Sequence, residues 1–538
     1  MTRRAASWSG TRIRRTVQVV VLLVFIALIL AARFHSGVRP GPILKIFFLL
    51  DPLVTIATAL AAHAFAAGAF LALITIAVTL LFGRVFCGWF CPFGTLHDIA
   101  GRLIDRFKPD KKLRHHFSPR QRIKYYVLAG FLAMAVFGGH WVTVFDPLVL
   151  SYRSFATGVL PAAQWAVEES TTPLAQSENK AIHAVSRYAT EPAYAFVRDH
   201  VFVASRQAFL GGGLILAIFI GLLLLNAWRR RFWCRYVCPL GALLGVFSLR
   251  PLLRRAADRA SCNECDLCAR SCHGAAAGAA GDKWIASECL GCLNCSESCR
   301  RSGLGFVWAS PLRNDPETAP LDLSRRALFA SAAGGLVALA ALRISPQSRG
   351  KVYEARLVRP PGSRAEREFL QRCTACGLCM KICVTGGLQP ALTEAGLEGL
   401  WTPRLEPRIG ACDYNCTLCG QVCPTEAIRP LTVEEKQKTK IGVAAFDVTR
   451  CIPYAYGRDC TVCEECCPIP EKAIYTTDDE VQVAGVRTTI KRPHVDPDKC
   501  IGCGACVNMC PLKDRPGIYV TSANESRHPD NQPFLTGY

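Results

Sequence analysis

The spacing of the cysteines constrains this chain more than any other feature of its sequence. It has 29 cysteines in 538 residues, and 25 of them lie between Cys262 and Cys510. Twenty-four of these form six groups of four; four groups read C-x2-C-x2-C-x3-C, and the other two open with x3 and x8. The groups are Cys262, Cys265, Cys268 and Cys272; Cys289, Cys292, Cys295 and Cys299; Cys373, Cys376, Cys379 and Cys383; Cys412, Cys416, Cys419 and Cys423; Cys451, Cys460, Cys463 and Cys467; and Cys500, Cys503, Cys506 and Cys510.

This spacing is the pattern that bacterial ferredoxins use to hold [4Fe–4S] clusters. The iron needs soft thiolate ligands, and three closely spaced cysteines can wrap one cubane while the fourth ligates the other cluster of a pair. Disulfide scaffolds do not repeat one spacing so regularly, and a zinc site would be satisfied by isolated C-x-x-C pairs. We therefore predict six [4Fe–4S] clusters held by these 24 cysteines.

In the first two groups, the last cysteine of each is expected to complete the cluster of the other. The fifth group leaves one cysteine over, Cys466, which we interpret as a packed thiol, although Cys460, Cys463 and Cys466 also read C-x2-C-x2-C. The expected ligand sets of the first two clusters are Cys262, Cys265, Cys268 and Cys299, and Cys289, Cys292, Cys295 and Cys272.

Long apolar stretches predict membrane helices. Hydrophobic residues make up 51% of the chain and the mean hydropathy is +0.21, which argues against a purely soluble enzyme. Each of four apolar segments approaches the roughly 20 residues that cross a bilayer, although a buried core helix is the alternative for any one of them. Two further segments, 43–50 and 52–63, flank Asp51 and Pro52 and are expected to be interfacial or re-entrant. The four predicted spans are 16–32, 64–82, 125–145 and 209–228.

The distribution of Lys and Arg orients these spans. The first 15 residues hold five, residues 83–124 hold ten and residues 229–259 hold eight, whereas the alternate loops 33–63 and 146–208 hold three and five. We therefore place the N-terminus and the first two cysteine groups in the cytoplasm. Because the basic runs lie beside apolar spans, the net charge of +21 indicates topology and not a nucleic-acid partner.

A fifth apolar stretch, 327–342, follows Ser324-Arg325-Arg326 and resembles an internal twin-arginine export signal. Clusters are normally assembled in the cytoplasm, so a domain that carries them must cross the membrane already folded. We expect residues 343–538 to be exported. The alternative is a packed linker that leaves them in the cytoplasm.

Two C-x-x-x-C-P motifs lie at the cytoplasmic ends of predicted spans, and each half of the membrane region also contains Asp-Pro-Leu. We interpret the region as a duplication with a longer outer loop, about 149–205, in its second copy. Cysteines four residues apart are expected on one side of a helical turn. The two pairs are predicted to hold a seventh cluster, to act as thiol/disulfide couples or to wall the first clusters, with structural packing as the alternative; nearby arginines favour thiolate. The cysteines are Cys87, Cys91, Cys234 and Cys238.

Asp51 and Asp146 are the acidic residues of the Asp-Pro-Leu repeats. They are candidates for accepting protons from quinol, and helix capping is an equally good interpretation. His63 and His140 are expected near the same outer level, where a quinol site, a haem pair and simple packing are all open and packing is favoured. His97-Asp98 follows the first C-x-x-x-C-P motif and receives no role.

These parts resemble two known families. Residues 1 to about 310 resemble the NapH/MauN membrane ferredoxin family, through FCGWFCPFG, WCRYVCPLG and the first two cluster motifs. Residues from about 320 to 520 resemble the NapG/MauM exported ferredoxin family, through SRRALF, CTACGLCMKIC, CTLCGQVCPTEAI and CIGCGACVNMCP. The chain therefore looks like a fusion of two usually separate proteins. It departs from the pattern where His273 follows Cys272 and Val384 follows Cys383.

The resemblance implies a polytopic α-helical membrane domain plus ferredoxin-like α+β iron–sulfur domains. The domains expected are a membrane domain over 1–250, a cytoplasmic two-cluster domain over 251–310, a linker over 311–345 and a periplasmic four-cluster domain over 346–538. The resemblance also implies that outer groups pair with outer and inner with inner. Under this pairing, Cys510 completes the cluster held by Cys373, Cys376 and Cys379, and Cys383 completes the cluster held by Cys500, Cys503 and Cys506. Likewise, Cys467 completes the cluster held by Cys412, Cys416 and Cys419, and Cys423 completes the cluster held by Cys451, Cys460 and Cys463.

The resemblance implies a function in electron transfer from membrane quinol, directly or through a partner, to a periplasmic acceptor in a nitrate-reductase-type chain. The protein would then be a quinol dehydrogenase component in the bacterial inner membrane. Its expected partners are lipid, the quinone pool and cytochrome or reductase subunits, with no nucleic acid. Two alternatives are a redox factor that matures or reactivates a metalloenzyme and a trans-membrane wire without quinone chemistry. No catalytic acid–base residues are identified.

Overall fold

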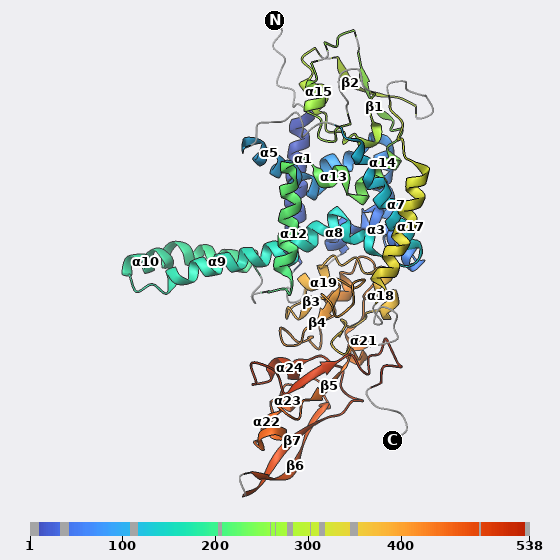
Figure 1. Ribbon diagram of the computed structural model, residues 1–538. Helices are drawn as coiled ribbons and strands as arrows, with labels where there is room; N and C mark the ends of the chain where they lie inside the picture. Colours follow the sequence, from blue (N-terminus) through green and yellow to red (C-terminus); the bar gives the residue numbers. More distant parts are fainter. Residues whose placement is uncertain are drawn as a thin grey trace. The chain divides into compact units, whose positions relative to one another are not determined.

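The computed structural model describes residues 10–32, 42–107, 117–202, 207–258, 260–263, 265–276, 283–301, 303–310, 318–344, 353–483 and 486–532. The chain forms two compact units, each built from several segments (Figure 1). The first unit comprises Met1–Ile29, Lys45–Ser154 and Leu214–Ala340, and the second comprises Leu30–Leu44, Phe155–Gly213 and Ala341–Tyr538.

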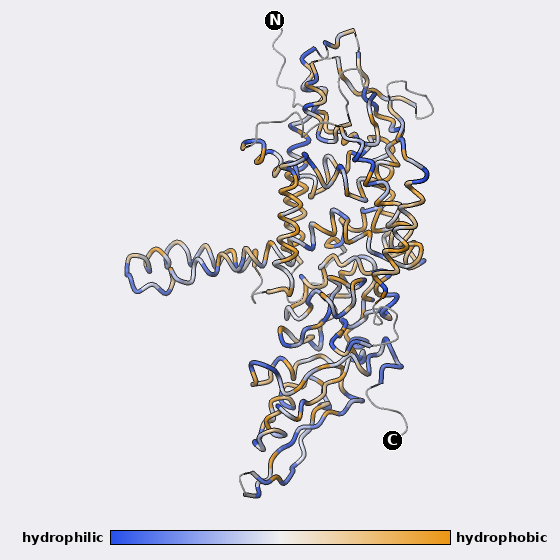
Figure 2. Tube along the Cα trace, in the orientation of Figure 1, coloured by the Kyte–Doolittle hydropathy of each residue, from blue (hydrophilic) through white to orange (hydrophobic). Residues whose placement is uncertain are grey.

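The first unit is mainly helical, as its long apolar runs require, and Figure 2 shows hydrophobic residues along α1 and α12. Short helices join the longer ones and position the C-x-x-x-C-P motifs. The helices are α1 (Gly10–Ala31), α2 (Ile46–Leu49), α3 (Pro52–Ala62), α4 (Ala72–Phe82), α5 (Pro92–Phe107), α7 (Ile123–Val136), α8 (Pro147–Ser154), α12 (Gly212–Leu224), α13 (Phe232–Tyr236), α14 (Pro239–Phe247), α15 (Leu267–Arg270), α16 (Asn294–Ser298) and α17 (Arg325–Leu342).

Two helices in the described ranges, α1 and α17, are long and apolar enough to cross a membrane. Four uninterrupted spans were expected before residue 230, so the structure corrects the segments 64–82, 125–145 and 209–228, whose helices are shorter. The first two are interrupted at Gly68 (φ +86°) and Gly138 (φ +83°), which take left-handed conformations that end a helix. Residues 327–342 are helical, as the apolar pattern indicates.

The segments that flank Asp51 form two helices, Ile43–Leu49 and Pro52–Ala62, bent by 79° at their junction. This geometry fits either a broken span or a re-entrant loop and agrees with the expectation that 43–50 and 52–63 are separate elements. Asp51 caps α3, since its carboxylate accepts hydrogen bonds from the backbone N–H groups of Leu53 and Val54, and Pro52 occupies the first helical position.

The region expected to be a long outer loop, about 149–205, is helical where it is described, apart from short connections. It continues from α8 through a π-helical turn into α9 (Leu160–Ala175), α10 (Lys180–Val185) and α11 (Glu191–His200). Alanine-rich polar sequence has good helix propensity, which accounts for the helices. Whether the segment lies outside the membrane stays a prediction.

The cysteine-rich part of the first unit lies in the sequence between β1 (Leu253–Ala257) and β2 (Leu304–Trp308), which pair with each other antiparallel. In the second unit, one pair of strands joins residues far apart in the sequence, because β5 pairs with β8. The other antiparallel pairs are β3 with β4 and β6 with β7. The strands are β3 (Leu388–Pro390), β4 (Pro403–Leu405), β5 (Val443–Phe446), β6 (Ile474–Val483), β7 (Val486–Val495) and β8 (Ile518–Thr521).

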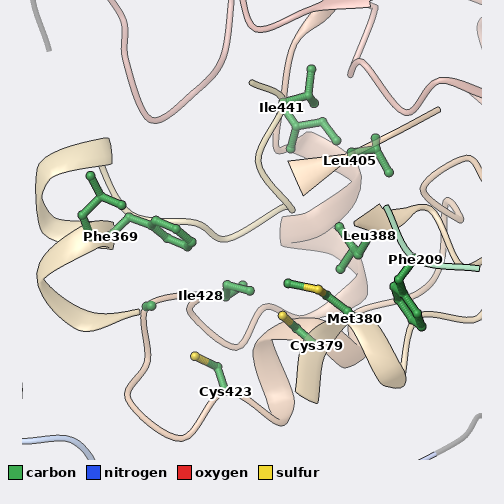
Figure 3. Packing of buried hydrophobic residues seen from close by; sticks show 12 residues of the cluster. Phe209, Phe369, Cys379, Met380, Leu388, Leu405, Cys423, Ile428 and Ile441 are labelled. Carbon is green, nitrogen blue, oxygen red and sulfur yellow. The ribbon is translucent and has the colours of Figure 1, made fainter. Parts of the chain in front are cut away.

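Short helices carry the cysteines of the second unit, and each follows the first cysteines of a group. One apolar cluster contains Cys379, Cys423, Phe369 and Met380, and Figure 3 shows these side chains together. A second cluster contains Cys463, Cys500 and Cys506. The helices are α18 (Glu366–Arg372), α19 (Leu378–Lys381), α20 (Leu418–Gln421), α21 (Val433–Lys438), α22 (Ile452–Tyr456), α23 (Val462–Glu465) and α24 (Ala505–Met509).

Candidate metal centres

The cysteines of the second unit gather into four sets of thiols. In the first set, Cys373, Cys376 and Cys379 lie near Cys423. Burial raises the pKa of the Cys379 thiol, and the nearby thiols of Cys376, Cys373 and Cys423 raise it further. Cys379 and Cys423 also belong to one apolar cluster, with Cys373 packed against it.

The second set surrounds a cavity. Cys383, Cys412, Cys416 and Cys419 line it together with apolar side chains that include Leu388. Burial raises the pKa of the Cys419 thiol, and the thiols of Cys412, Cys416 and Cys383 act in the same direction. Four thiols around an apolar cavity are the donor set that a [4Fe–4S] cluster requires.

The third and fourth sets involve the last two groups. Burial and the thiols of Cys466, Cys510, Cys460 and Cys451 raise the pKa of Cys463. This places Cys510 beside the group that begins at Cys451.

Cys467 lies with the last group. Burial raises the pKa of Cys503 to about 11, and the thiols of Cys500 and Cys467 contribute. Cys466 differs, because its thiol donates to the carbonyl of Cys463 (3.5 Å). Cys466 also lies beside Cys463, so its interpretation as a packed thiol stays a prediction.

The pairing of outer with outer and inner with inner groups was therefore wrong. The structure places Cys423, not Cys510, beside Cys373, Cys376 and Cys379. It likewise places Cys383 beside the second group, Cys467 beside the last and Cys510 beside the third. The physical reason is local chain closure: exchange between adjacent groups closes shorter loops, which costs less conformational entropy than exchange across the domain.

The four sets lie in an order that differs from the sequence. The Cys379 thiol lies near Cys419 of the second set. The backbone N–H of Cys412 donates to the carbonyl of Cys503 (2.8 Å), which joins the second set to the last group. Cys506 lies near Cys463. The order in space is thus first, second, fourth and third group.

In the first unit, Cys289, Cys292 and Cys295 lie beside Cys272, as predicted. Burial raises the pKa of Cys295, and the thiols of Cys272, Cys292 and Cys289 raise it further. The Cys272 sulfur accepts a hydrogen bond from the backbone N–H of Ala276 (3.2 Å). We call this set the inner set.

Cys262, Cys265 and Cys268 begin the other set of the first unit. Cys262 and Cys265 are exposed and Cys268 is half-buried. Burial raises the pKa of Cys268, and Cys262 is among the groups that contribute. The assignment of Cys299 to this set stays a prediction.

The two C-x-x-x-C-P motifs meet, although not as residues on one face of an α-helix. Cys87 lies in a π-helical turn, Phe86–Phe90, and Cys91 is the extended residue that ends it. Cys238 is the N-cap of α14. All four thiols are buried, and Cys238 has Cys234, Cys87 and Cys91 as its electrostatic neighbours. We call Cys87, Cys91, Cys234 and Cys238 the four-thiol centre.

The four-thiol centre contacts the inner set through the loop between Cys87 and Cys91. The indole N–H of Trp89 donates to the carbonyl of Gly291 (2.9 Å). A Cβ atom on Gly88 would lie 2.2 Å from the carbonyl oxygen of Leu290, so only glycine permits this approach. Leu290 and Gly291 lie between Cys289 and Cys292, so the two sets of thiols share a backbone contact.

Two buried carboxylates, absent from the predicted site residues, hold the region around the four-thiol centre together. Asp98 accepts hydrogen bonds from Arg231 Nε (2.8 Å) and Nη2 (2.7 Å), and its Oδ1 lies 3.1 Å from Nδ1 of His273, an imidazole whose pKa burial lowers to about 4. Arg14 also lies against Asp98 (3.5 Å). Asp98 had received no role, because a single acidic residue after a histidine carries no distinctive signal in the sequence.

Glu288 is the second such carboxylate. It accepts a hydrogen bond from Tyr125 (3.0 Å), pairs with Arg84 (3.2 Å) and contacts Lys124. Because Glu288 precedes Cys289, and because His273 follows Cys272, both carboxylates connect the surroundings of the four-thiol centre to residues of the inner set.

Comparison with known proteins supports iron–sulfur binding in both parts of the chain. Residues 64–110 and 210–257, which contain the C-x-x-x-C-P motifs, match a family described as a 4Fe-4S binding domain, and residues 493–513 match a second family with the same description. No solved structure matches the chain.

Several curated relatives are similar. The methylamine utilization ferredoxin-type protein MauM of Methylorubrum extorquens is 37% identical over 202 residues, which are 36% of this chain and 87% of MauM. The ferredoxin-type protein NapG of Escherichia coli is 32% identical over 190 residues, 35% of this chain and 80% of NapG. This chain belongs to the ferredoxin-type protein family of MauM and NapG. Its role is iron–sulfur electron transfer. YccM of Escherichia coli, whose name describes an electron transport protein, is 28% identical over 285 residues, 51% of this chain and 66% of YccM.

The donor sets of this ferredoxin-type chain fit clusters and not single ions. Within the described ranges, no three His, Cys, Asp or Glu side chains converge on a single-ion site. A cubane takes four thiolates, one on each iron, and the sets described above bring cysteines of two groups together. The donor chemistry therefore fits [4Fe–4S] clusters.

The acidic residues of the Asp-Pro-Leu repeats and the nearby histidines were further candidates in this ferredoxin-type protein. Asp146 caps α8 as Asp51 caps α3, and the two carboxyl groups lie beside each other. His140 is buried and its Nε2 lies 3.1 Å from Thr58 Oγ1, so packing is the right interpretation for it. His63 is exposed at the end of α3. His97 is buried, with Nδ1 2.7 Å from the Asn226 amide.

Proposed function

We propose that this chain is a membrane-bound polyferredoxin that passes electrons from quinol, directly or through a partner, to an acceptor outside the cytoplasm. The observation that carries the proposal is the order of the thiol sets in the second unit, where each set adjoins the next. Six sets hold [4Fe–4S] clusters, which accept and donate one electron at a time. The protein contributes ligands, burial and hydrogen bonds that tune each potential.

The topology follows from α17. This 18-residue helix separates the two cysteine groups of the first unit from the four of the second in the sequence. If it crosses the bilayer, the two groups that follow the basic segment 229–259 stay in the cytoplasm and the other four lie outside. The Arg325-Arg326 pair at its start is the export signal. A NapH/MauN-like membrane part fused to a NapG/MauM-like exported part has this arrangement.

The electron path in the second unit runs from the set at Cys373 through those at Cys412 and Cys503 to the set at Cys463. The set of Cys451, Cys460, Cys463 and Cys510 is therefore the terminal one. Because this set lies at the end of the order, it is the one that would transfer electrons to a partner. The partner we propose is a reductase or cytochrome subunit.

The four-thiol centre takes a seventh [4Fe–4S] cluster in this proposal. Its support is the family match over both C-x-x-x-C-P motifs, the burial of all four thiols and the backbone contact with the inner set. Backbone N–H groups of Gly94 and Gly241 donate to the sulfurs of Cys91 (3.4 Å) and Cys238 (3.2 Å) and stabilise thiolate there.

A cavity between α3 and α4 is our candidate for the quinol head group. Its volume is about 490 Å³, and its lining is apolar, with Pro52, Ile56, Phe70 and Ile76 among the residues. Apolar cavities of this size suit small ring-shaped ligands. The cavity reaches Pro52, which follows Asp51 in the sequence. It therefore lies close to Asp51 and Asp146, the carboxyl pair of the Asp-Pro-Leu repeats.

The decisive experiment is anaerobic reduction of the purified chain by a short-chain quinol, followed by absorbance and EPR. We expect the clusters to be reduced, and we expect Ile76→Trp, which fills the cavity, to slow this reduction. Ile74→Trp is the matched control, because Ile74 is exposed on the same helix and does not line the cavity. If dithionite reduces the clusters and quinol does not, the isolated chain is not a quinol dehydrogenase.

The topology has its own test. A reporter that is active only outside the cytoplasm, fused after Tyr538, should be active. The variant Arg325→Lys/Arg326→Lys should abolish that activity while the protein remains in the membrane. A reporter that works only in the cytoplasm would contradict export of the second unit.

A further inference from the structure

The two C-x-x-x-C-P motifs are part of a longer repeat. Each motif has an arginine three residues before its first cysteine and a glycine three residues after its second, so both read R-x-x-C-x-x-x-C-P-x-G. The first copy runs from Arg84 to Gly94 and the second from Arg231 to Gly241. Neither arginine has side-chain exposure above 1%.

Each arginine reaches the motif of the other copy while also lying near the first cysteine of its own, Arg84 near Cys87 and Arg231 near Cys234. Arg231, from the second copy, donates through Nη1 to the carbonyl of Cys87 (3.1 Å) in the first copy. Both of its terminal nitrogens lie 3.6 Å from the position of a Cβ atom on Gly94, the glycine whose N–H donates to the Cys91 sulfur. Arg231 therefore lies against the first motif.

Arg84 makes the reciprocal approach. Its Nη2 lies 2.7 Å from the position of a Cβ atom on Gly241, and the Cys238 sulfur lies 3.3 Å from the same point. The N–H of Gly241 donates to that sulfur. Both glycines leave room for the arginine of the other copy, which explains why a residue with no side chain recurs at this position.

We propose that Arg84 and Arg231 are exchanged positioning residues, which hold the four-thiol centre together and offset the negative charge of the cluster that it takes. The inference rests on the proposed seventh cluster. A four-thiolate site carries excess negative charge, and a buried cation close to it favours the reduced state by simple Coulomb attraction.

The carboxylates explain how two buried arginines are tolerated. A buried cation without a partner is costly, and each arginine has one outside the four-thiol centre. Arg231 binds Asp98 through two nitrogens, and Arg84 pairs with Glu288 and donates to the carbonyl of Ser287 (3.0 Å). Each arginine thus lies between a thiol pair and a carboxylate, and this fixes its position.

Arg84→Gln and Arg231→Gln test the proposal in the full-length chain. Each removes one charge and keeps a polar side chain. In mediated redox titrations followed by EPR, we expect each variant to shift the cluster of the four-thiol centre most, to a more negative midpoint potential. Arg231→Gln should also shift the cluster of the inner set by a smaller amount, because Arg231 lies near Cys292. The conservative variants Arg84→Lys and Arg231→Lys should restore most of the shift, because lysine keeps the charge.

Arg230→Gln is the matched control. Arg230 neighbours Arg231, but it pairs with Asp105 (2.7 Å) on the far part of α5 and not with the four-thiol centre. Its substitution should leave all potentials unchanged. The proposal is overturned if both glutamine variants match Arg230→Gln, or if every cluster shifts equally.

Iron content distinguishes a failure of this inference from a failure of the protein to fold and from a failure of the proposed function. Cys91→Ser should lower the iron content by about four atoms per chain, which shows that the centre is loaded. If it loses none, the inference fails even when quinol reduces the protein. If the arginine variants shift the midpoint potential but quinol does not reduce the clusters, only the proposed function is contradicted.

Discussion

The carboxyl groups of Asp51 and Asp146 lie beside each other in the interior of the first unit, where neither has any exposed surface and the Oδ2 atom of each has no hydrogen-bond partner among the described residues. Each also caps its own helix, with one oxygen accepting from the two N–H groups that follow the proline. Two carboxylates in such contact cannot both be charged, so one of them carries a proton.

This contact predicts opposite outcomes for two substitutions. Asp51→Asn keeps the cap and places an N–H donor against Asp146, so we expect unfolding stability equal to or above that of the parent protein. Asp51→Ala removes the cap and leaves Asp146 buried without its partner, which should cost about 1–3 kcal/mol. Thermal unfolding in detergent measures both. A similar loss in Asp51→Asn would show that the shared proton does not matter.

The ligand sets predict which double variants are additive. Cys376→Ser should destroy or degrade one cluster, with a loss of up to about four iron atoms. Cys376→Ser/Cys423→Ser should lose no more than that, because both residues belong to one set. Cys376→Ser/Cys510→Ser should lose about twice as much. Iron analysis and EPR check this, and the reverse pattern would restore the pairing of outer groups.

The contact between the four-thiol centre and the inner set predicts a glycine requirement. Gly88→Ala places a methyl group against the backbone of Leu290, which cannot move like a side chain, so we expect a loss of about 1–3 kcal/mol and slower transfer between the two centres. Freeze-quench EPR follows the transfer. Gly221→Ala in α12 is the control, since nothing lies within 4 Å of the added Cβ, and it should be neutral or slightly stabilising.

His97 predicts a dependence of stability on pH. Burial, and then the charge of Arg231, lower its pKa from 6.5 to about 4. The unfolded chain therefore binds a proton between these two values that the folded chain does not bind, so the free energy of unfolding falls as pH decreases through this window. The full effect is about 3 kcal/mol. His97→Gln should reduce the slope of the unfolding profile between pH 6.5 and 4, and His273, whose pKa burial also lowers to about 4, should maintain the rest. An unchanged slope would contradict this explanation.

Some features were readable from the residues alone. The repeated spacing identified the cysteine groups, because a cubane demands thiolates at fixed intervals along a loop. The exchange between the Cys272 and Cys299 groups was predicted from the same rule, and the structure bears out its inner set. The apolar runs located α1 and α17, because an uninterrupted run has few other stable outcomes.

Other features needed the tertiary structure. Residues 64–82 contain enough apolar sequence for a span, but Gly68 takes a left-handed conformation that interrupts the helix. The apolar content of a segment does not predict the backbone conformation of one residue within it. The pairing of the later four groups was wrong, since every group offers the same ligands and only the folded path of the chain decides which loop closes on which.

The sequence by itself determined the chemistry of this protein: thiolate ligands in ferredoxin spacing, on a chain with apolar helices. The tertiary structure decided which thiols meet, in what order the sets follow one another, and that Arg84 and Arg231 each serve the other's motif. The physical reason is that ligand identity is a property of single residues and their near neighbours. Contacts between distant segments depend on packing and buried charge, which arise only when the whole chain has folded.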